Sequence, residues 1–229
     1  MNGPMSSIDN HTCRLCDQST VRPFLDLGSM PIANAFLSSE QLSQPEYTFN
    51  LATGFCESCF MVQLIDTVDP NMLFHDNYAY FSSISHVMDQ HFAELANIIS
   101  NEIFYDENLS VIEIGSNDGI LLEKISGYSS NTIGIEPSSN VAAVAKSKGL
   151  QVISEFFNSD LASQLVSDYN LAQLVVGANV LCHIPDLNEL ARALNAVLDD
   201  EGVFIFEDPY LLDIMSKLAY DQIYDEHFY

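Results

Sequence analysis

The chain has 229 residues, and its 48% hydrophobic content excludes an intrinsically disordered protein. Its 32 Asp and Glu residues against 7 Lys and Arg residues give a net charge of -25, which excludes nucleic acid and anionic membrane surfaces as partners because both bind basic patches. No apolar run reaches the roughly 18 residues of a membrane-spanning helix, and residues 1–10 lack the basic start and apolar stretch of a signal peptide. We therefore expect no membrane partner and a cytoplasmic protein whose cysteines stay reduced.

The first predicted region, residues 11–68, contains short β-like runs and two C-x-x-C pairs, Cys13 with Cys16 and Cys56 with Cys59. Two such turns supply four thiolates in tetrahedral arrangement, which favours Zn²⁺. Four protein ligands leave no open position, so the predicted zinc is structural; an iron–sulfur cluster is the alternative. A hairpin between the pairs would close the long gap from 17 to 55. The fifth cysteine, Cys182, is interpreted as a core residue.

Residues 69–104 are predicted to form a connector that contains a helix from 86 to 103. Apolar side chains recur along it at helical spacing, at Val87, Phe92, Leu95, Ile98 and Ile99.

Residues 105–229 show alternating strand and helix patterns. Apolar strands are predicted at 109–115, 131–137, 150–154, 171–179 and 202–208, with helices near 119–126, 139–147, 159–167 and 187–198. This alternation is typical of a doubly wound α/β domain, a Rossmann-like parallel sheet covered by helices on both faces.

A glycine turn between the first strand and first helix of this domain predicts a nucleoside-type cofactor. Gly115 allows a sharp turn beside a ligand, Gly119 opens the helix, and Asn117 between them tolerates positive φ. Glu113 and Asp118 place carboxylates near the ligand, which disfavours a pyrophosphate. The same carboxylates suit the ammonium and sulfonium of S-adenosylmethionine.

Further candidates follow later strands, where ligands bind in such sheets. Glu136, followed by Pro137 at the end of the second strand, lies where a ribose-binding acid is expected. Phe157, with its neighbour Phe156, either flanks an adenine or belongs to the core. Asn179 and His183 follow the fourth strand and are expected to face the ligand, although a lone histidine is also commonly structural.

Several segments together resemble the deoxysugar C-methyltransferases that have an N-terminal zinc-binding domain; they are residues 13–16, 24–36, 78–83, 113–119, 207–210 and 224–227. This resemblance implies an S-adenosylmethionine-dependent enzyme that methylates C3 of a nucleotide-diphospho-4-keto-6-deoxyhexose. A base removes the proton next to the ketone, and the resulting enolate attacks the methyl group.

The resemblance also implies residue roles. His227 matches the general base, Tyr224 and Glu226 match residues that hold the sugar and poise the base, and Tyr78 and His183 match further catalytic-site residues. Without the resemblance, the tail around His227 would read as a solvated end. Asp225 departs from the family pattern, which has histidine there.

The chain stops at Tyr229, where family members continue with a second α/β domain, so we expect either half of such an enzyme or a shortened relative, with a separate chain as a candidate source of the sugar-binding part. Three alternatives stay open: a non-catalytic cofactor-binding module, a methyltransferase for a small uncharged or cationic acceptor, and an NAD enzyme. The NAD enzyme is disfavoured because the middle glycine and a Tyr-x-x-x-Lys pair are missing. An anionic substrate would find few cations, since only Arg192 and Lys217 follow Lys148.

Overall fold

A computed structural model describes residues 11–102 and 109–229. The start of the chain, where the absence of a signal peptide was inferred, and Ile103, the predicted last residue of the connector helix, lie outside the described residues. The chain forms two compact units, one of Met1–Leu73, Cys182–Leu187 and Pro209–Tyr229, the other of Phe74–Leu181 and Asn188–Asp208. The first unit thus includes two segments from the region assigned by sequence to the α/β domain.

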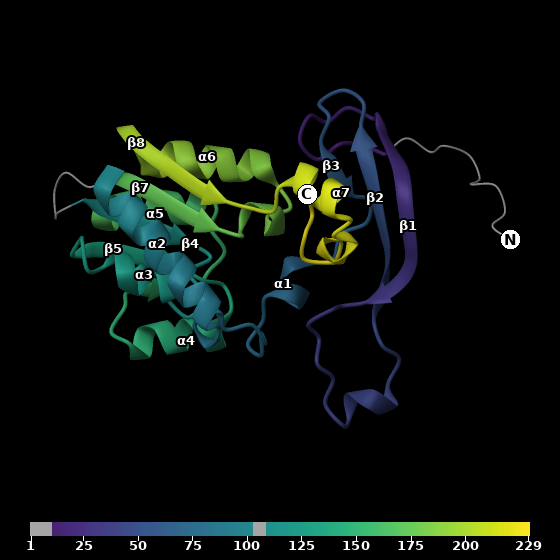
Figure 1. The fold of residues 1–229 in the computed structure, drawn as a ribbon, viewed down its shortest axis with the longest axis horizontal. Helices are drawn as coiled ribbons and strands as arrows, with labels where there is room; N and C mark the ends of the chain where they lie inside the picture. The colour runs from purple at the N-terminus through teal and green to yellow at the C-terminus, as the bar shows by residue number, and fades with distance from the viewer. Residues whose placement is uncertain (1–10, 103–108) are drawn as a thin grey trace, which may run out of the picture. The chain divides into compact units, whose positions relative to one another are not determined.

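The first unit is built on a small antiparallel sheet of order β1-β2-β3, from β1 (Val21–Pro31), β2 (Thr48–Cys56) and β3 (Val62–Leu64) (Figure 1). The strands β1 and β2 form the predicted hairpin, whose connection carries a short 3-10 turn, η1 (Gln41–Ser43). Their pairing is interrupted by bulges, one of which contains Gly28 at φ 80°. The unit also contains α1 (Pro70–Leu73), α7 (Leu211–Lys217) and η4 (Tyr220–Gln222).

The second unit is a five-stranded parallel sheet of order β6-β5-β4-β7-β8. Its strands are β4 (Ser110–Ile114), β5 (Asn131–Ile135), β6 (Val152–Ile153), β7 (Ala172–Ala178) and β8 (Leu198–Glu207). All five predicted strands are confirmed. The last begins earlier than predicted because Leu198 already pairs with Ala172, and the ladder resumes only at Val203 after an irregularity.

The helices of this unit are α2 (His86–Glu102), α3 (Ile120–Ile125), α4 (Ser139–Ser147), α5 (Ser159–Tyr169) and α6 (Leu187–Val197), with a 3-10 turn η2 (Ser82–Ile84). A second 3-10 turn, η3 (Leu181–His183), has its first residue in this unit and its other two in the first unit. The predicted doubly wound α/β class is therefore confirmed. In Figure 1, α2 crosses the sheet.

Both faces of the parallel sheet are covered. Val111 of β4 belongs to a core cluster with Phe92, Ala96 and Ile99 of α2 and with residues of α3. Successive strand residues point to opposite faces, and Ile112 is also buried. The interpretation of α2 needs one correction: Val87 and Ile98, which were expected on its apolar face, are 73% and 58% exposed. The stripe passes through Ala96 instead, because Phe92, Ala96 and Ile99 follow the 3.6-residue period more closely.

No described helix is both long enough and apolar enough to traverse a bilayer.

Candidate functional site

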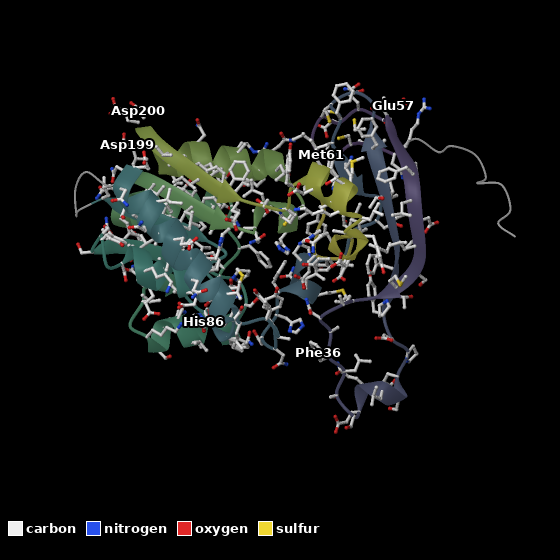
Figure 2. The ribbon with its side chains drawn as sticks, in the orientation of Figure 1. Phe36, Glu57, Met61, His86, Asp199 and Asp200 are labelled. Atoms are coloured by element: carbon white, nitrogen blue, oxygen red, sulfur yellow. The ribbon has the colours of Figure 1, made fainter. Side chains whose placement is uncertain are left out.

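The four paired cysteines come together in the first unit. The antiparallel register places Val21 opposite Cys56, and His11 bridges to Val21, so the turn that begins at Cys13 meets the turn at the end of β2. Figure 2 shows the second turn at the end of β2, where Glu57 and Met61 are labelled. The hairpin thus joins the two pairs across the gap in sequence.

The cysteine geometry fits a tetrahedral metal ion. The four sulfur atoms of Cys13, Cys16, Cys56 and Cys59 all lie within 4.8 Å of one another. Two of the separations, Cys13 to Cys59 and Cys16 to Cys56, are 3.6 and 3.7 Å. Four sulfurs about 2.3 Å from one zinc ion would lie about 3.8 Å apart. The donor set and its spacing therefore suit Zn²⁺, with no position left for a substrate.

The glycine turn of the second unit has the backbone conformation that the sequence predicted. Gly115, Asn117 and Gly119 have φ angles of 66°, 48° and 83°. A side chain at Gly115 would also overlap Val180, and one at Gly119 would overlap Leu150. At Gly115 and Gly119 the positive φ and the lack of space for a side chain both require glycine. Asn117 has only the conformational strain of a positive φ.

Residues of the connector form hydrogen bonds with the side chains of the same turn, and the sequence patterns did not predict these contacts. Asn117 accepts a hydrogen bond from the Ser82 backbone N–H at 3.0 Å and donates to the Tyr80 carbonyl at 3.1 Å. Asp118 accepts from the Ser83 hydroxyl and from the Ser83 N–H at 3.3 Å. The Asp118 side chain, predicted to face the cofactor, is therefore engaged in fixing the turn. The serine-rich stretch was visible in the sequence, but its target was not.

Two buried carboxyl groups lie beneath the turn. Burial raises the pKa of Glu113 well above its usual value, and the Glu136 carboxylate raises it further. Burial also raises the pKa of Glu136, against hydrogen bonds donated by the backbone of Ser138 at 2.8 Å and Asn117 at 3.0 Å. Glu113 Oε2 and Ser116 Oγ are buried and have no hydrogen-bond partner among the described residues. A ligand with hydrogen-bond donors and a positive charge would satisfy these two atoms, so the chemistry of the residues beneath the turn fits S-adenosylmethionine.

The remaining predicted cofactor residues surround this edge of the sheet. Pro137 directly follows Glu136 and is partly buried. Asn179 is exposed at φ 54°, and its N–H donates to the Glu207 carbonyl at 2.6 Å. Phe157 is partly buried.

Phe156, the residue before Phe157, packs against aromatic rings of the connector. The ring of Phe156 packs edge-on against Phe74 at 6.4 Å. Phe74 in turn lies 5.5 Å from the ring of Tyr78, which is buried. Asn140 donates to the Tyr78 carbonyl at 2.8 Å. Tyr78 therefore belongs to the second unit, together with the glycine turn.

The other predicted catalytic residues gather in the first unit. His227 Nδ1 lies 2.8 Å from the Gln222 carbonyl oxygen, which can only accept, so Nδ1 carries the proton and Nε2 is the basic atom. The Tyr224 hydroxyl lies 3.0 Å from Nε2. The rings of His183 and His227 are 5.0 Å apart, and His183 Nδ1 is 3.8 Å from Glu226 Oε2. The structure thus brings these four residues together.

Burial sets the protonation state of His183. Its side chain is 15% exposed. Desolvation, assisted by the charge of nearby His227, lowers the pKa of His183 to about 3. At neutral pH this imidazole is therefore uncharged, and one of its nitrogens is a hydrogen-bond donor.

The tail that carries His227 is anchored in the core of the first unit. Phe228 is fully buried, its N–H donates to the Cys182 carbonyl at 2.7 Å, and its carbonyl accepts from Leu64 N–H at 3.0 Å. The solvated end that sequence reasoning alone suggested does not form. Asp225, the departure from the family pattern, is buried and accepts from the Ala33 N–H at 3.0 Å.

Comparison with known proteins gives matches to both parts of the chain. Residues 13–74 match a family described as "Putative zinc binding domain", and residues 83–229 match one described as "Methyltransferase domain". The C-methyltransferase NovU of Streptomyces niveus is 30% identical over 216 residues, which are 94% of this chain and 51% of NovU. The chain therefore spans about half the length of this relative.

Solved structures of methyltransferases are similar at lower identity. The plantazolicin methyltransferase BpumL, in complex with a pentazolic analogue and SAH, is 19% identical with a TM-score of 0.49, covering 61% of this chain and 58% of its own. The sugar N-methyltransferase KedS8 from Streptoalloteichus is 19% identical with a TM-score of 0.43, covering 53% of this chain and 49% of its own. At these values the two structures carry no inference about substrate.

Proposed function

Because the chain belongs to the methyltransferase family matched by residues 83–229, we propose that it is an S-adenosylmethionine-dependent C-methyltransferase acting at C3 of a nucleotide-diphospho-4-keto-deoxyhexose. The observation that carries the choice of reaction is the 30% identity with a C-methyltransferase over nearly the whole chain. The proposal assigns cofactor binding to the second unit and proton transfer to the first.

The cofactor residues have distinct tasks in this proposal. Glu136 already receives two backbone N–H groups, but a carboxylate has about four acceptor sites, so two remain for ribose hydroxyls. Glu113 has a second oxygen without a partner among the described residues and a pKa raised by burial; in this proposal the positive charge of the bound ligand favours its ionised form. Bound S-adenosylmethionine supplies an electrophilic methyl group.

Proton transfer is assigned to the histidine pair. His227 Nε2 removes the C3 proton, whose acidity comes from the adjacent C4 ketone, and Gln222 holds the opposite nitrogen so that this tautomer persists. Neutral His183 donates a hydrogen bond to the developing enolate oxygen. Bound S-adenosylmethionine would supply its methyl group to the enolate carbon and would be left as S-adenosylhomocysteine.

The experiment is an incubation with a nucleotide-linked 4-keto-6-deoxyhexose in deuterated water, with mass spectrometry of the sugar. We expect exchange of the C3 hydrogen and a methyl group on carbon. His227→Gln should abolish both, whereas His86→Gln, at an exposed histidine of α2, should retain both. Methylation at oxygen or nitrogen without C3 exchange would refute the proposal.

That outcome would support a second candidate, a methyltransferase for a small uncharged or cationic acceptor. The net charge of -25 favours it. So do the ion pairs of Arg192 with Glu189 and Lys217 with Asp213, each at 2.9 Å, because they occupy two of the few cations.

A further inference from the structure

The segment that carries His227 is held from both sides by the N-terminal part of the chain. Before His227, Glu226 Oε1 accepts from the Asn34 side-chain amide at 2.6 Å. After it, the Phe228 carbonyl accepts from Arg14 Nη2 at 2.8 Å. Asn34 and Arg14 are 192 and 214 residues away from these partners in sequence. The base thus lies between two long-range polar contacts.

Arg14 is well suited to fix this segment. Its Nη1 donates to the Leu64 carbonyl at 2.7 Å while Nη2 donates to Phe228, so one planar guanidinium joins the end of β3 to the tail. The guanidinium carbon also lies 5.1 Å from the centre of the Tyr229 ring. A lysine has one point charge and cannot reproduce this two-pronged geometry.

The backbone of Arg14 is itself fixed. The residue lies inside the turn between Cys13 and Cys16, and its N–H donates to Gln63 Oε1 at 3.2 Å. The metal-binding turn therefore presents the guanidinium from a defined position. Through Arg14 the metal-binding turn is therefore connected to the residue that follows the proposed catalytic histidine.

Asn34 meets a different need. Glu226 is 2% exposed, and a buried carboxylate is costly unless hydrogen bonds satisfy it. Asn34 provides such a donor and so helps to place the Glu226 carboxylate, whose Oε2 lies 3.8 Å from His183 Nδ1. Burial of Phe228 holds the segment against the core but does not fix its orientation, because the hydrophobic effect is non-directional. These hydrogen bonds do fix the orientation, because they depend on the donor–acceptor angle.

From these contacts we propose that Arg14 and Asn34 are positioning residues, which act through Phe228 and Glu226 to hold His227 in its reactive place. This inference rests on the proposed function for its catalytic meaning. Its structural content, that the two side chains order the tail, can be measured without any turnover.

The test uses the full chain with zinc bound and compares Arg14→Lys and Asn34→Ala with wild type and with Arg22→Lys. Arg22 is the matched control because it lies in the same unit and pairs with exposed Glu57. Amide hydrogen exchange of the peptide covering residues 224–229 is followed by mass spectrometry. We expect roughly tenfold or faster exchange in both test variants, since each loses a hydrogen bond to a charged group, and no change in Arg22→Lys.

Zinc content, S-adenosylhomocysteine affinity and turnover separate positioning from general damage. Both variants should keep zinc and the cofactor affinity, and kcat should fall about tenfold or more at unchanged KM for S-adenosylmethionine. If Arg14→Lys loses zinc, the exchange rate of Asn34→Ala alone tests the inference, because Asn34 is not adjacent to a cysteine. Wild-type exchange rates in the tail of both variants would overturn the inference. A wild-type chain that does not methylate the sugar refutes the proposed function, and the exchange data still decide the positioning.

Discussion

The replacement Glu136→Ala tests the buried acid beneath the glycine turn. It leaves the buried N–H group of Ser138 and the partly buried N–H group of Asn117 without their acceptor. An unsatisfied buried donor costs about 1–3 kcal/mol, so two cost about 2–6 kcal/mol. Relief of the repulsion between Glu113 and Glu136 opposes this loss. We therefore expect the free energy of unfolding to fall by about 2–3 kcal/mol.

The same replacement removes the proposed ribose acceptor. Because the ligand loses two hydrogen bonds to a charged carboxylate, its affinity should drop at least about 100-fold for S-adenosylhomocysteine. Urea unfolding measures the first effect and calorimetric titration the second. Glu123→Ala is the control, because this α3 carboxylate is 60% exposed and its ion pair with Lys148 spans 3.9 Å; it should change stability by less than about 0.5 kcal/mol.

The two measurements can fail separately. Unfolding of Glu136→Ala at the wild-type free energy would mean that its hydrogen bonds do not organise the turn. Unchanged ligand affinity in a folded Glu136→Ala chain would refute the ribose assignment while leaving the structural role intact.

Three further predictions concern other parts of the chain. Gly119→Ala should destabilise in urea by about 1–3 kcal/mol more than Gly149→Ala, because both positions have positive φ (83° and 85°) but only Gly119 would overlap Leu150; equal losses would contradict this. Because the pKa of His183 is lowered to about 3, the unfolded chain binds the extra proton, so stability should fall as pH drops from about 6.5 towards 3, by up to about 1.4 kcal/mol per pH unit. His183→Gln should flatten that slope in pH-dependent unfolding, and an unaltered slope would argue against a neutral imidazole. Metal analysis should give one zinc per chain, retained in Cys182→Ser and lost in Cys16→Ser; loss in both would place Cys182 in the site.

Local patterns in the sequence were sufficient for the strands and helices of the parallel sheet and for naming the residues proposed at the two candidate sites. The C-x-x-C spacing indicated the zinc turns because two cysteines separated by two residues share one turn in any surroundings. Gly115 and Gly119 indicated the sharp turn because positive φ is a property of the residue itself. The alternation of apolar strands and helices determined the parallel sheet, since each pattern reports a period of its own backbone.

The resemblance of residues 224–227 to a family also indicated which side chains are candidates for catalysis. It did not determine that this tail is buried. Composition around His227 is polar and aromatic, and burial of Phe228 depends on the strand β3 and on Cys182, which are distant in the chain.

Only the tertiary structure decided which side chains meet across long separations. Arg14 lies between Cys13 and Cys16, and no sequence pattern indicated that its side chain binds the backbone beside the proposed base. Asp118 was expected to lie near a ligand, and only the structure shows that it also accepts hydrogen bonds from Ser83. Such pairings are absent from sequence patterns because periodicity and spacing report local geometry, whereas a hydrogen bond between the two ends of a chain exists only after packing has brought them together.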